Sequence, residues 1–108
     1  MRIIALEKEK HEYSAGDFQP HLNAEAAKVW ELYQAGIIRE VYFRADVTEA
    51  VLILECADVN QAKAVLATLP LVETGLITFD IIPLRPYDGF ARLFNQKTDK
   101  PYAKGANL

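Results

Sequence analysis

The chain has 108 residues, of which 51% are hydrophobic and 25% are charged, and its formal net charge is -3. This length fits one soluble domain. The acidic balance argues against a nucleic-acid partner, because such proteins usually carry a basic face. No apolar run approaches the roughly 20 residues of a membrane helix. The single cysteine, Cys56, excludes an internal disulfide and a cysteine-rich zinc site, so we expect a cytoplasmic protein.

The first half of the chain predicts a strand, a helix and a second strand. Residues 2–7 are apolar on both faces, which is typical of a central strand. After a long polar segment, Pro20 suits the first turn of a helix, and apolar residues recur at helical spacing as far as Tyr33. Gly36 is placed to end this helix in a left-handed conformation. Residues 37–44 are rich in β-branched and aromatic types and predict the second strand.

The second half repeats this order of strand, helix and strand. A short turn leads to an apolar run at residues 50–56, which predicts a hairpin with the preceding strand. Asp58 begins a second helix, with Gln61 three residues later as in a capping box, and Pro70 is expected to stop it. Residues 76–82 predict the last strand.

The resulting order βαββαβ predicts an α+β, ferredoxin-like fold. In this fold two helices cover one face of a four-stranded antiparallel sheet, and the first and third strands are central. The third strand places Val51 and Ile53 on one face and Leu52 and Leu54 on the other, so both faces of the sheet are apolar. Because two helices cover only one face, we expect a second copy to cover the other, as a homodimer.

The chain is expected to form one domain over residues 1–94. This domain includes an aromatic C-terminal arm, residues 85–94, which we expect to dock across the sheet or on a partner. Residues 95–108 are polar and are expected to be loosely held.

Three segments resemble the muconolactone isomerase-like family. They are Val-Trp-Glu-Leu-Tyr-Gln-Ala-Gly at residues 29–36, Ala-Thr-Leu-Pro-Leu at residues 67–71, and Ile-Pro-Leu at residues 82–84. The resemblance extends over residues 20–84 and implies the dimeric α/β-barrel superfamily, with assembly as a dimer or a larger oligomer. The family's named enzyme shifts a double bond in an unsaturated lactone during aromatic catabolism, without a metal or organic cofactor. This chain departs from it before the first helix and in its longer aromatic tail, and no catalytic residue matches position by position.

Such a double-bond shift needs a base, an acid and a donor that steadies the enolate. We expect the cleft on the sheet face away from the helices. Period-two spacing assigns to that face Ile38, Glu40, Tyr42, Arg44, Thr78, Asp80 and Ile82. It assigns to the helix-facing core Val41, Phe43, Ile77, Phe79 and Ile81.

The candidate catalytic residues are His21 and Asp80. An imidazole titrates near neutral pH, and a carboxylate buried in an apolar strand becomes a stronger base. The competing interpretations are a surface histidine at the helix start and an edge-strand aspartate that faces water. Tyr42, Arg44 and Glu40 are the candidate substrate-binding residues, with Arg44 binding a carboxylate. Charges on edge strands also deter unwanted pairing, which is the alternative explanation for them.

No residue pattern predicts a metal site or a phosphate loop, and no cofactor is expected. Trp30 and Tyr33 are expected to lie in the core, as is Cys56. The sequence supports a cofactor-independent isomerase-like protein that acts on a small unsaturated lactone or organic acid by proton transfer. The alternatives are a non-catalytic dimeric module for small-ligand binding or assembly and, with less support, a cofactor-independent monooxygenase.

Overall fold

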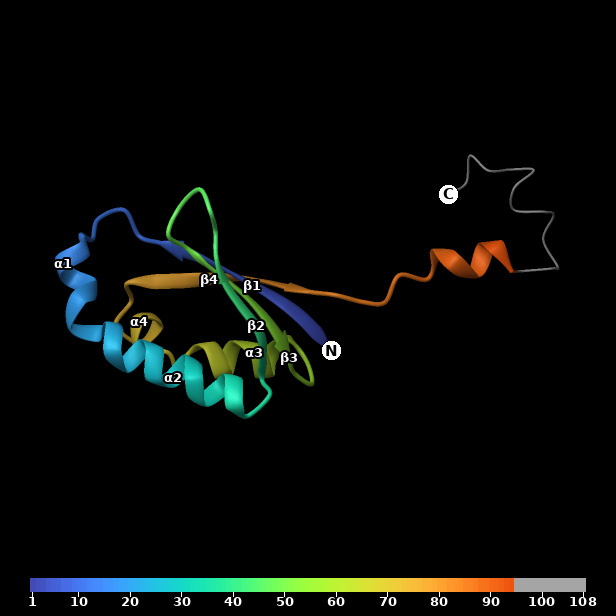
Figure 1. The fold of residues 1–108 in the computed structure, drawn as a ribbon, viewed down its shortest axis with the longest axis horizontal. Coiled ribbons are helices and arrows are strands. Elements are labelled where there is room, and N and C mark those ends of the chain that lie inside the picture. Colours follow the sequence, from blue (N-terminus) through green and yellow to red (C-terminus); the bar gives the residue numbers. More distant parts are fainter. Residues whose placement is uncertain (95–108) are drawn as a thin grey trace.

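The computed structural model describes residues 1–94 and contains one antiparallel sheet. Its strands are β1 (Arg2–Glu9), β2 (Ile38–Phe43), β3 (Ala50–Glu55) and β4 (Ile77–Pro83), in the order β2-β3-β1-β4. The helices are α1 (Ala15–Phe18), η1 (Gln19–His21), α2 (Leu22–Gln34), α3 (Val59–Leu66), α4 (Pro70–Glu73) and η2 (Gly89–Leu93). Figure 1 shows α2 and α3 on one face of the sheet. The predicted ferredoxin-like fold is confirmed, with β1 and β3 central.

Local signals in the sequence set several helix boundaries. Gly36 follows α2 with a φ of 80°, the left-handed conformation predicted for it. Asp58 caps α3, because its Oδ1 accepts a hydrogen bond from the backbone N–H of Gln61 at 2.8 Å. The prediction that Pro70 stops the second helix was wrong. The helix α3 already ends at Leu66, and Pro70 is the first residue of α4, where its missing N–H costs nothing.

The core lies between the sheet and the helices. Ile3 and Ala5 of β1 and Leu52 and Leu54 of β3 are almost completely buried there. They pack with side chains from the helices and loops, among them Leu32, Leu66 and Leu69. On the other face, which we call the far face, Ile4, Leu6, Val51 and Ile53 are only half-buried. The prediction that both faces are apolar is therefore confirmed.

An irregularity in β2 changes which residues share a face. The register between β2 and β3 shifts between Ile38 and Glu40. This shift turns Ile38 to the helix side, where it is 1% exposed, while Glu40 and Tyr42 remain on the far face. Placing Ile38 on the same face as Glu40 was therefore wrong, because an extra residue in one strand breaks the period of two.

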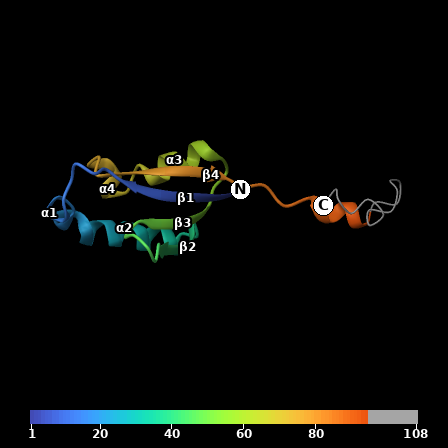
Figure 2. The same ribbon diagram turned by 90° about the horizontal axis from the view of Figure 1, so that it is seen from above.

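The arm, residues 85–94, extends away from the body of the molecule. Its last backbone contact with the sheet is the hydrogen bond from Leu84 N–H to Arg2 O at 2.9 Å. Both views show the chain continuing from β4 past the end of the sheet to η2 (Figures 1 and 2). The arm therefore does not lie across its own sheet.

None of the described helices is long and apolar enough to cross a membrane.

Candidate functional site

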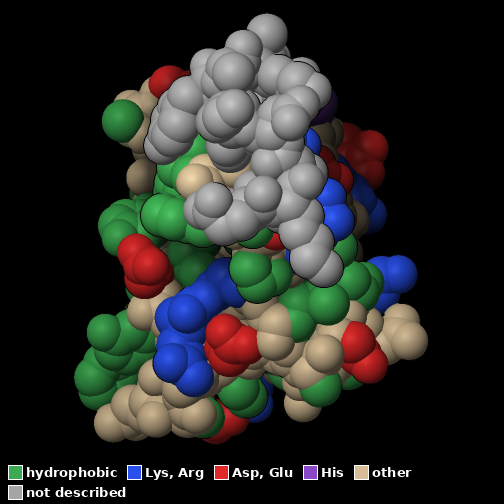
Figure 3. Space-filling view, turned by 90° about the vertical axis from the view of Figure 1, so that its right-hand side faces the viewer, with side chains coloured by type: hydrophobic (Ala, Val, Ile, Leu, Met, Phe, Trp, Pro, Cys, Tyr) green, Lys and Arg blue, Asp and Glu red, His purple; other side chains and the backbone are tan. Residues whose placement is uncertain are grey.

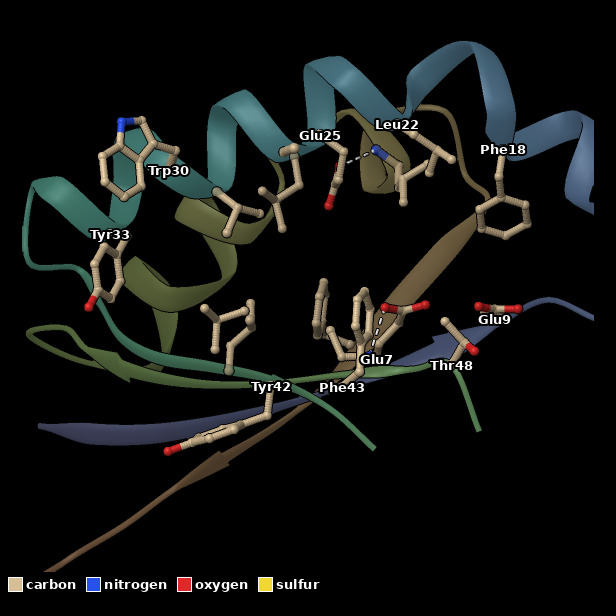
Figure 4. Close-up of a pocket in the computed structure, with 18 of the residues that line it drawn as sticks. Glu7, Glu9, Phe18, Leu22, Glu25, Trp30, Tyr33, Tyr42, Phe43 and Thr48 are labelled. Carbon is tan, nitrogen blue, oxygen red and sulfur yellow. Dashed lines mark hydrogen bonds between the residues drawn. The ribbon is translucent and has the colours of Figure 1, made fainter. Parts of the chain in front are cut away.

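A large pocket separates α2 and α1 from the helix-facing side of the sheet. Its volume is about 1010 Å³. Figure 4 shows α2 above the cavity and the strands below it. Most of its wall is apolar and includes Phe18, Leu22, Val29, Trp30, Tyr33, Phe43 and Phe79. Toward the C-terminal end of α2 the cavity gives way to the core, because Leu32 packs there.

Glu7 is the buried acid of this pocket. It follows Ile3 and Ala5 on the helix-facing side of β1 and is only 7% exposed. Its Oε1 accepts a hydrogen bond from the backbone N–H of Ala50 at 2.9 Å. Figure 4 shows its carboxyl group projecting from the sheet into the cavity. One carboxylate oxygen is thus held by the backbone of β3.

Burial raises the pKa of Glu7 from 4.5 to about 7, because the charged form loses water. The Ala50 N–H opposes this rise, and the neighbouring carboxyls of Glu9 and Glu49 add to it. Glu49 is itself held in place, since its Oε2 accepts a hydrogen bond from the Glu9 N–H at 3.3 Å. A carboxyl group with a pKa near neutrality is suited to take and return a proton.

Glu25 faces this group from the other side of the cavity. It projects downward from α2 toward the sheet (Figure 4). Its Oε1 accepts a hydrogen bond from the backbone N–H of Leu71 at 2.9 Å. Burial raises the pKa of Glu25, and the Leu71 bond partly opposes that rise. The pocket therefore brings together two acids whose protonated forms are favoured by their surroundings.

The charged side chains of the pocket are mostly acidic. Glu7, Glu9 and Glu25 line it on the helix side of the sheet, against the single cation Arg39, whereas Glu40 borders it from the far face. The Nε of Arg39 donates a hydrogen bond to Gly36 O at 2.6 Å, at the C-terminal end of α2. A ligand in this pocket thus meets an apolar wall and an excess of carboxyl groups.

The two candidate catalytic residues lie outside this pocket. His21 ends η1, is half-buried and does not line the cavity. Asp80 is exposed and pairs with Leu6 across β1 and β4, which places it on the far face. The structure therefore does not bring His21 and Asp80 together.

The candidate binding residues are occupied by local contacts at the edge strand. The Tyr42 hydroxyl donates to Glu40 Oε1 at 2.5 Å, and this bond raises the pKa of Tyr42. Figure 4 shows the Tyr42 ring pointing away from the cavity. Arg44 binds Asp46 through Nε and Nη2 at 2.9 and 2.5 Å and approaches Glu49 at 3.4 Å. These contacts engage the Arg44 guanidinium within the hairpin.

Sequence reasoning missed the acids of the pocket and misplaced two aromatic residues. Glu7 lies two residues after Ala5 and four after Ile3, so its helix-facing position was open to prediction from period-two spacing. Trp30 and Tyr33 were expected in the core, but they are 58% and 46% exposed and stack on each other at 5.9 Å. They are exposed because β2 ends the sheet and leaves no further strand to cover them.

We call the open edge between α2 and β2 the mouth of the pocket. It is formed by Trp30, Tyr33, Val41 and Phe43, each at least 45% exposed.

Among residues 1–94, no group of three or more histidine, cysteine, aspartate or glutamate side chains is arranged to hold a metal ion. The raised pKa values of Glu7 and Glu25 suit acid–base chemistry in an apolar cavity.

The fold and the pocket define a small ferredoxin-like α+β protein with a cavity between its helices and its sheet. No protein-family model matches the chain, and no curated protein matches it. A solved structure does: 5-chloro-2-hydroxyhydroquinone dehydrochlorinase (TftG) from Burkholderia phenoliruptrix AC1100, in complex with 2,5-dihydroxybenzoquinone. The match has a TM-score of 0.58 and 16% identity and covers 82% of this chain and 98% of that chain. At this identity the similarity concerns the fold.

Proposed function

We propose that this protein is a cofactor-independent enzyme that moves a proton on a small unsaturated ring compound. It acts as an isomerase or as a related lyase, within the muconolactone isomerase-like group of the dimeric α/β barrels and in the cytoplasm. One observation carries this proposal: the Glu7 carboxyl group is buried in an apolar cavity, with its pKa raised to about 7. Such a group is a competent general base and general acid at neutral pH.

The proposed reaction begins with Glu7 as a carboxylate. It takes a proton from a ring carbon beside a carbonyl, and the electron pair of the broken C–H bond moves into the carbonyl to form an enolate. Glu25 in its protonated form donates a hydrogen bond to the enolate oxygen. In an isomerase, protonated Glu7 returns the proton to a carbon further along the conjugated system. In a lyase, the enolate re-forms the carbonyl as a leaving group departs with its bonding electrons.

The charge of the pocket favours a neutral substrate over an organic acid. A substrate carboxylate would meet the carboxylate of Glu7, the side chain of Glu9 and one arginine. In a cavity of low dielectric constant, like charges repel more strongly than in water. A lactone, quinone or hydroxylated ring has no such penalty, and its hydroxyl groups can donate to carboxylate oxygens. TftG, which shares the fold, acts on a hydroxylated ring according to its name.

Turnover by the purified full chain tests this proposal. The probes are 5-chloro-2-hydroxyhydroquinone, a neutral hydroxylated ring whose keto tautomer has a ring C–H beside a carbonyl, and muconolactone, a lactone that carries an acid, both followed by absorbance. We expect turnover of the neutral ring, with kcat reduced by roughly 10²-fold or more in Glu7→Gln. The matched control is Glu12→Gln, which changes an exposed glutamate outside the pocket and should leave kcat unchanged.

The pH dependence of this activity separates a base from a binding group. If Glu7 acts as a carboxylate, kcat/KM rises with pH and levels off above a pKa of about 7. Full activity of Glu7→Gln would refute the assignment of the base. Tight binding of both probes without turnover would instead identify a non-catalytic small-ligand module.

We also propose that the far face binds a second copy of the chain. On this face Ile82 and Tyr42 are 41% and 56% exposed, beside the half-buried apolar residues of β1 and β3. Sedimentation velocity should show a homodimer at micromolar concentration. Ile53→Glu, which puts a charge on this face, should give single chains, whereas Asn60→Glu, at an exposed position of α3, should not. A natural chain that sediments as a monomer throughout would contradict the proposal.

A further inference from the structure

The arm is a hydrophobic element whose rings are not covered by the described body of its own chain. Tyr87, Phe90 and Phe94 are 69%, 65% and 74% exposed, although aromatic rings of this size gain strongly from burial. After Leu84, the described backbone hydrogen bonds of the arm lie within η2 and its flanks. Seen from the side on which the arm projects, the molecule exposes several groups of hydrophobic side chains (Figure 3). Three exposed rings on one short segment indicate a surface that is buried elsewhere.

The arm is nevertheless locally ordered. The rings of Tyr87 and Phe90 meet edge to face with their centroids 5.0 Å apart. Gly89 is buried beneath the Tyr87 ring, and a Cβ at this position would collide with that ring. A side chain at this position would therefore force the Tyr87 ring to move. A segment that is already ordered loses less entropy on docking.

The mouth of the pocket offers a matching surface. Its four residues are apolar, exposed and lie over a cavity that contains buried acids. The arm carries Arg85 and Arg92 against the single acid Asp88, whereas the pocket has an excess of carboxyl groups. The two surfaces are thus complementary in both apolar character and charge.

Strand register shows where the arm would lie in a dimer whose far faces meet. Pro83 pairs with Ile3, Ile3 pairs with Leu54, and Leu54 pairs with Ile38, so β4 ends at the same end of the sheet at which β2 begins. The two strands lie at opposite edges of one sheet. If two sheets pack through their far faces about a two-fold axis parallel to the strands, β4 of one copy lies over β2 of the other. The arm then leaves beside the start of the partner's β2, next to the end of the partner's α2.

The dimensions agree with this arrangement. The arm spans roughly 25–30 Å if its first residues are extended and the rest is a 3₁₀ helix. Trp30 lies four residues before the end of α2, which is about 6 Å along the helix axis. Three rings per arm, each about two-thirds to three-quarters exposed, together with two arms and matching areas on two mouths, would bury roughly 1,200–2,000 Å², the size of a specific interface.

We propose that the arm of one copy docks on the mouth of a second copy and closes its pocket. Each site is then completed by the partner's aromatic residues, and two sites form together in the dimer. Closure removes water from the cavity around Glu7 and strengthens every electrostatic interaction inside it. This inference extends the proposed dimer, but its test does not depend on the proposed reaction.

Trp30 provides the measurement, because it is the single tryptophan of the chain and forms part of the mouth. We expect quenching of its fluorescence by acrylamide to fall several-fold as the protein concentration rises through the range of dimer formation. The arm variant, Tyr87→Ser with Phe90→Ser, should remain fully quenchable at every concentration. The control is Val47→Ser, which removes a 45% exposed apolar residue from the hairpin outside the pocket.

A mixing experiment decides between the chain's own arm and the partner's arm. Chains with the arm substitutions and Trp30 are diluted, mixed with an excess of Trp30→Phe chains that have the natural arm, and concentrated again. Protection of the remaining tryptophan is expected, because the arm then comes from the second chain.

Three results would overturn the inference. The first is Trp30 that stays protected from acrylamide in the natural chain at any dilution. The second is protection of Trp30 in the arm variant without added chains, and the third is no protection of Trp30 after mixing. Glu7→Gln should keep Trp30 protected while it loses turnover. Failure of the proposed reaction is therefore distinguished from failure of the docked arm.

Discussion

Replacing Glu7 with glutamine isolates the energetic cost of its charge. Glutamine has almost the same shape and keeps an oxygen that can accept the 2.9 Å hydrogen bond from the Ala50 N–H. It lacks the negative charge that burial disfavours. Any pH-dependent difference between the natural chain and Glu7→Gln therefore reports on ionisation of this carboxyl group.

The sign of this difference follows from the raised pKa. Between pH 4.5 and about pH 7, folded Glu7 holds a proton that the unfolded chain has released, so the free energy of unfolding falls as pH rises. A tenfold change in the acid dissociation constant corresponds to about 1.4 kcal/mol, so ionisation of Glu7 removes at most about 3 kcal/mol between about pH 4 and pH 8. The natural chain has this stability in full below pH 4.5 and has lost it above about pH 7.

Urea denaturation at about pH 5 and about pH 8 measures the effect. We expect Glu7→Gln to match the natural chain closely at the lower pH and to exceed it by at most about 3 kcal/mol at the higher pH. Glu12→Gln, at an exposed site, should follow the natural chain at both. If Glu7→Gln and the natural chain keep a constant difference in stability across this range, Glu7 is ionised at no cost and the reasoning fails.

Three further substitutions test the fold by the same urea method. Leu54→Ala should cost about 2–5 kcal/mol, because Leu54 is fully buried at the centre of the sheet; a loss well below 1 kcal/mol would contradict its place in the core. Asp58→Ala should cost about 1 kcal/mol through loss of the α3 cap, while Asp58→Asn should retain stability; equal losses in both would argue against the cap. Gly36→Ala should cost about 1 kcal/mol because of its φ of 80°, and a gain in stability would show that this conformation is not strained.

Local patterns sufficed for the four strands, for the two longer helices and for most of the face assignments. Period-two spacing correctly placed Val41, Phe43 and Phe79 on the helix side and Asp80 on the far face, because cross-strand partners share a face. The left-handed Gly36 was predictable because few other residues accept that conformation. These features depend on a few neighbouring residues, so the sequence contains them directly.

Periodicity failed where the geometry depends on distant parts of the chain. Ile38 changed face because of a bulge, which no local signal in β2 announces. Trp30 and Tyr33 belong to the apolar stripe of α2, but helical spacing cannot show how far a sheet extends beneath that stripe. The sheet ends at β2, so the stripe became the mouth of a pocket instead of core.

The sequence by itself determined the order of elements, the two apolar faces of the sheet and the position of a glutamate on the helix-facing side of β1. Only the tertiary structure decided that Glu7 lies in a cavity and that the arm leaves the body. The height of α2 above the sheet sets how much water reaches that carboxyl group. This height results from packing between segments far apart in the sequence, such as Leu32 with Leu69 in the core and Glu25 with Leu71 by a hydrogen bond. The pKa of a side chain follows from such packing, because desolvation depends on everything that surrounds the group.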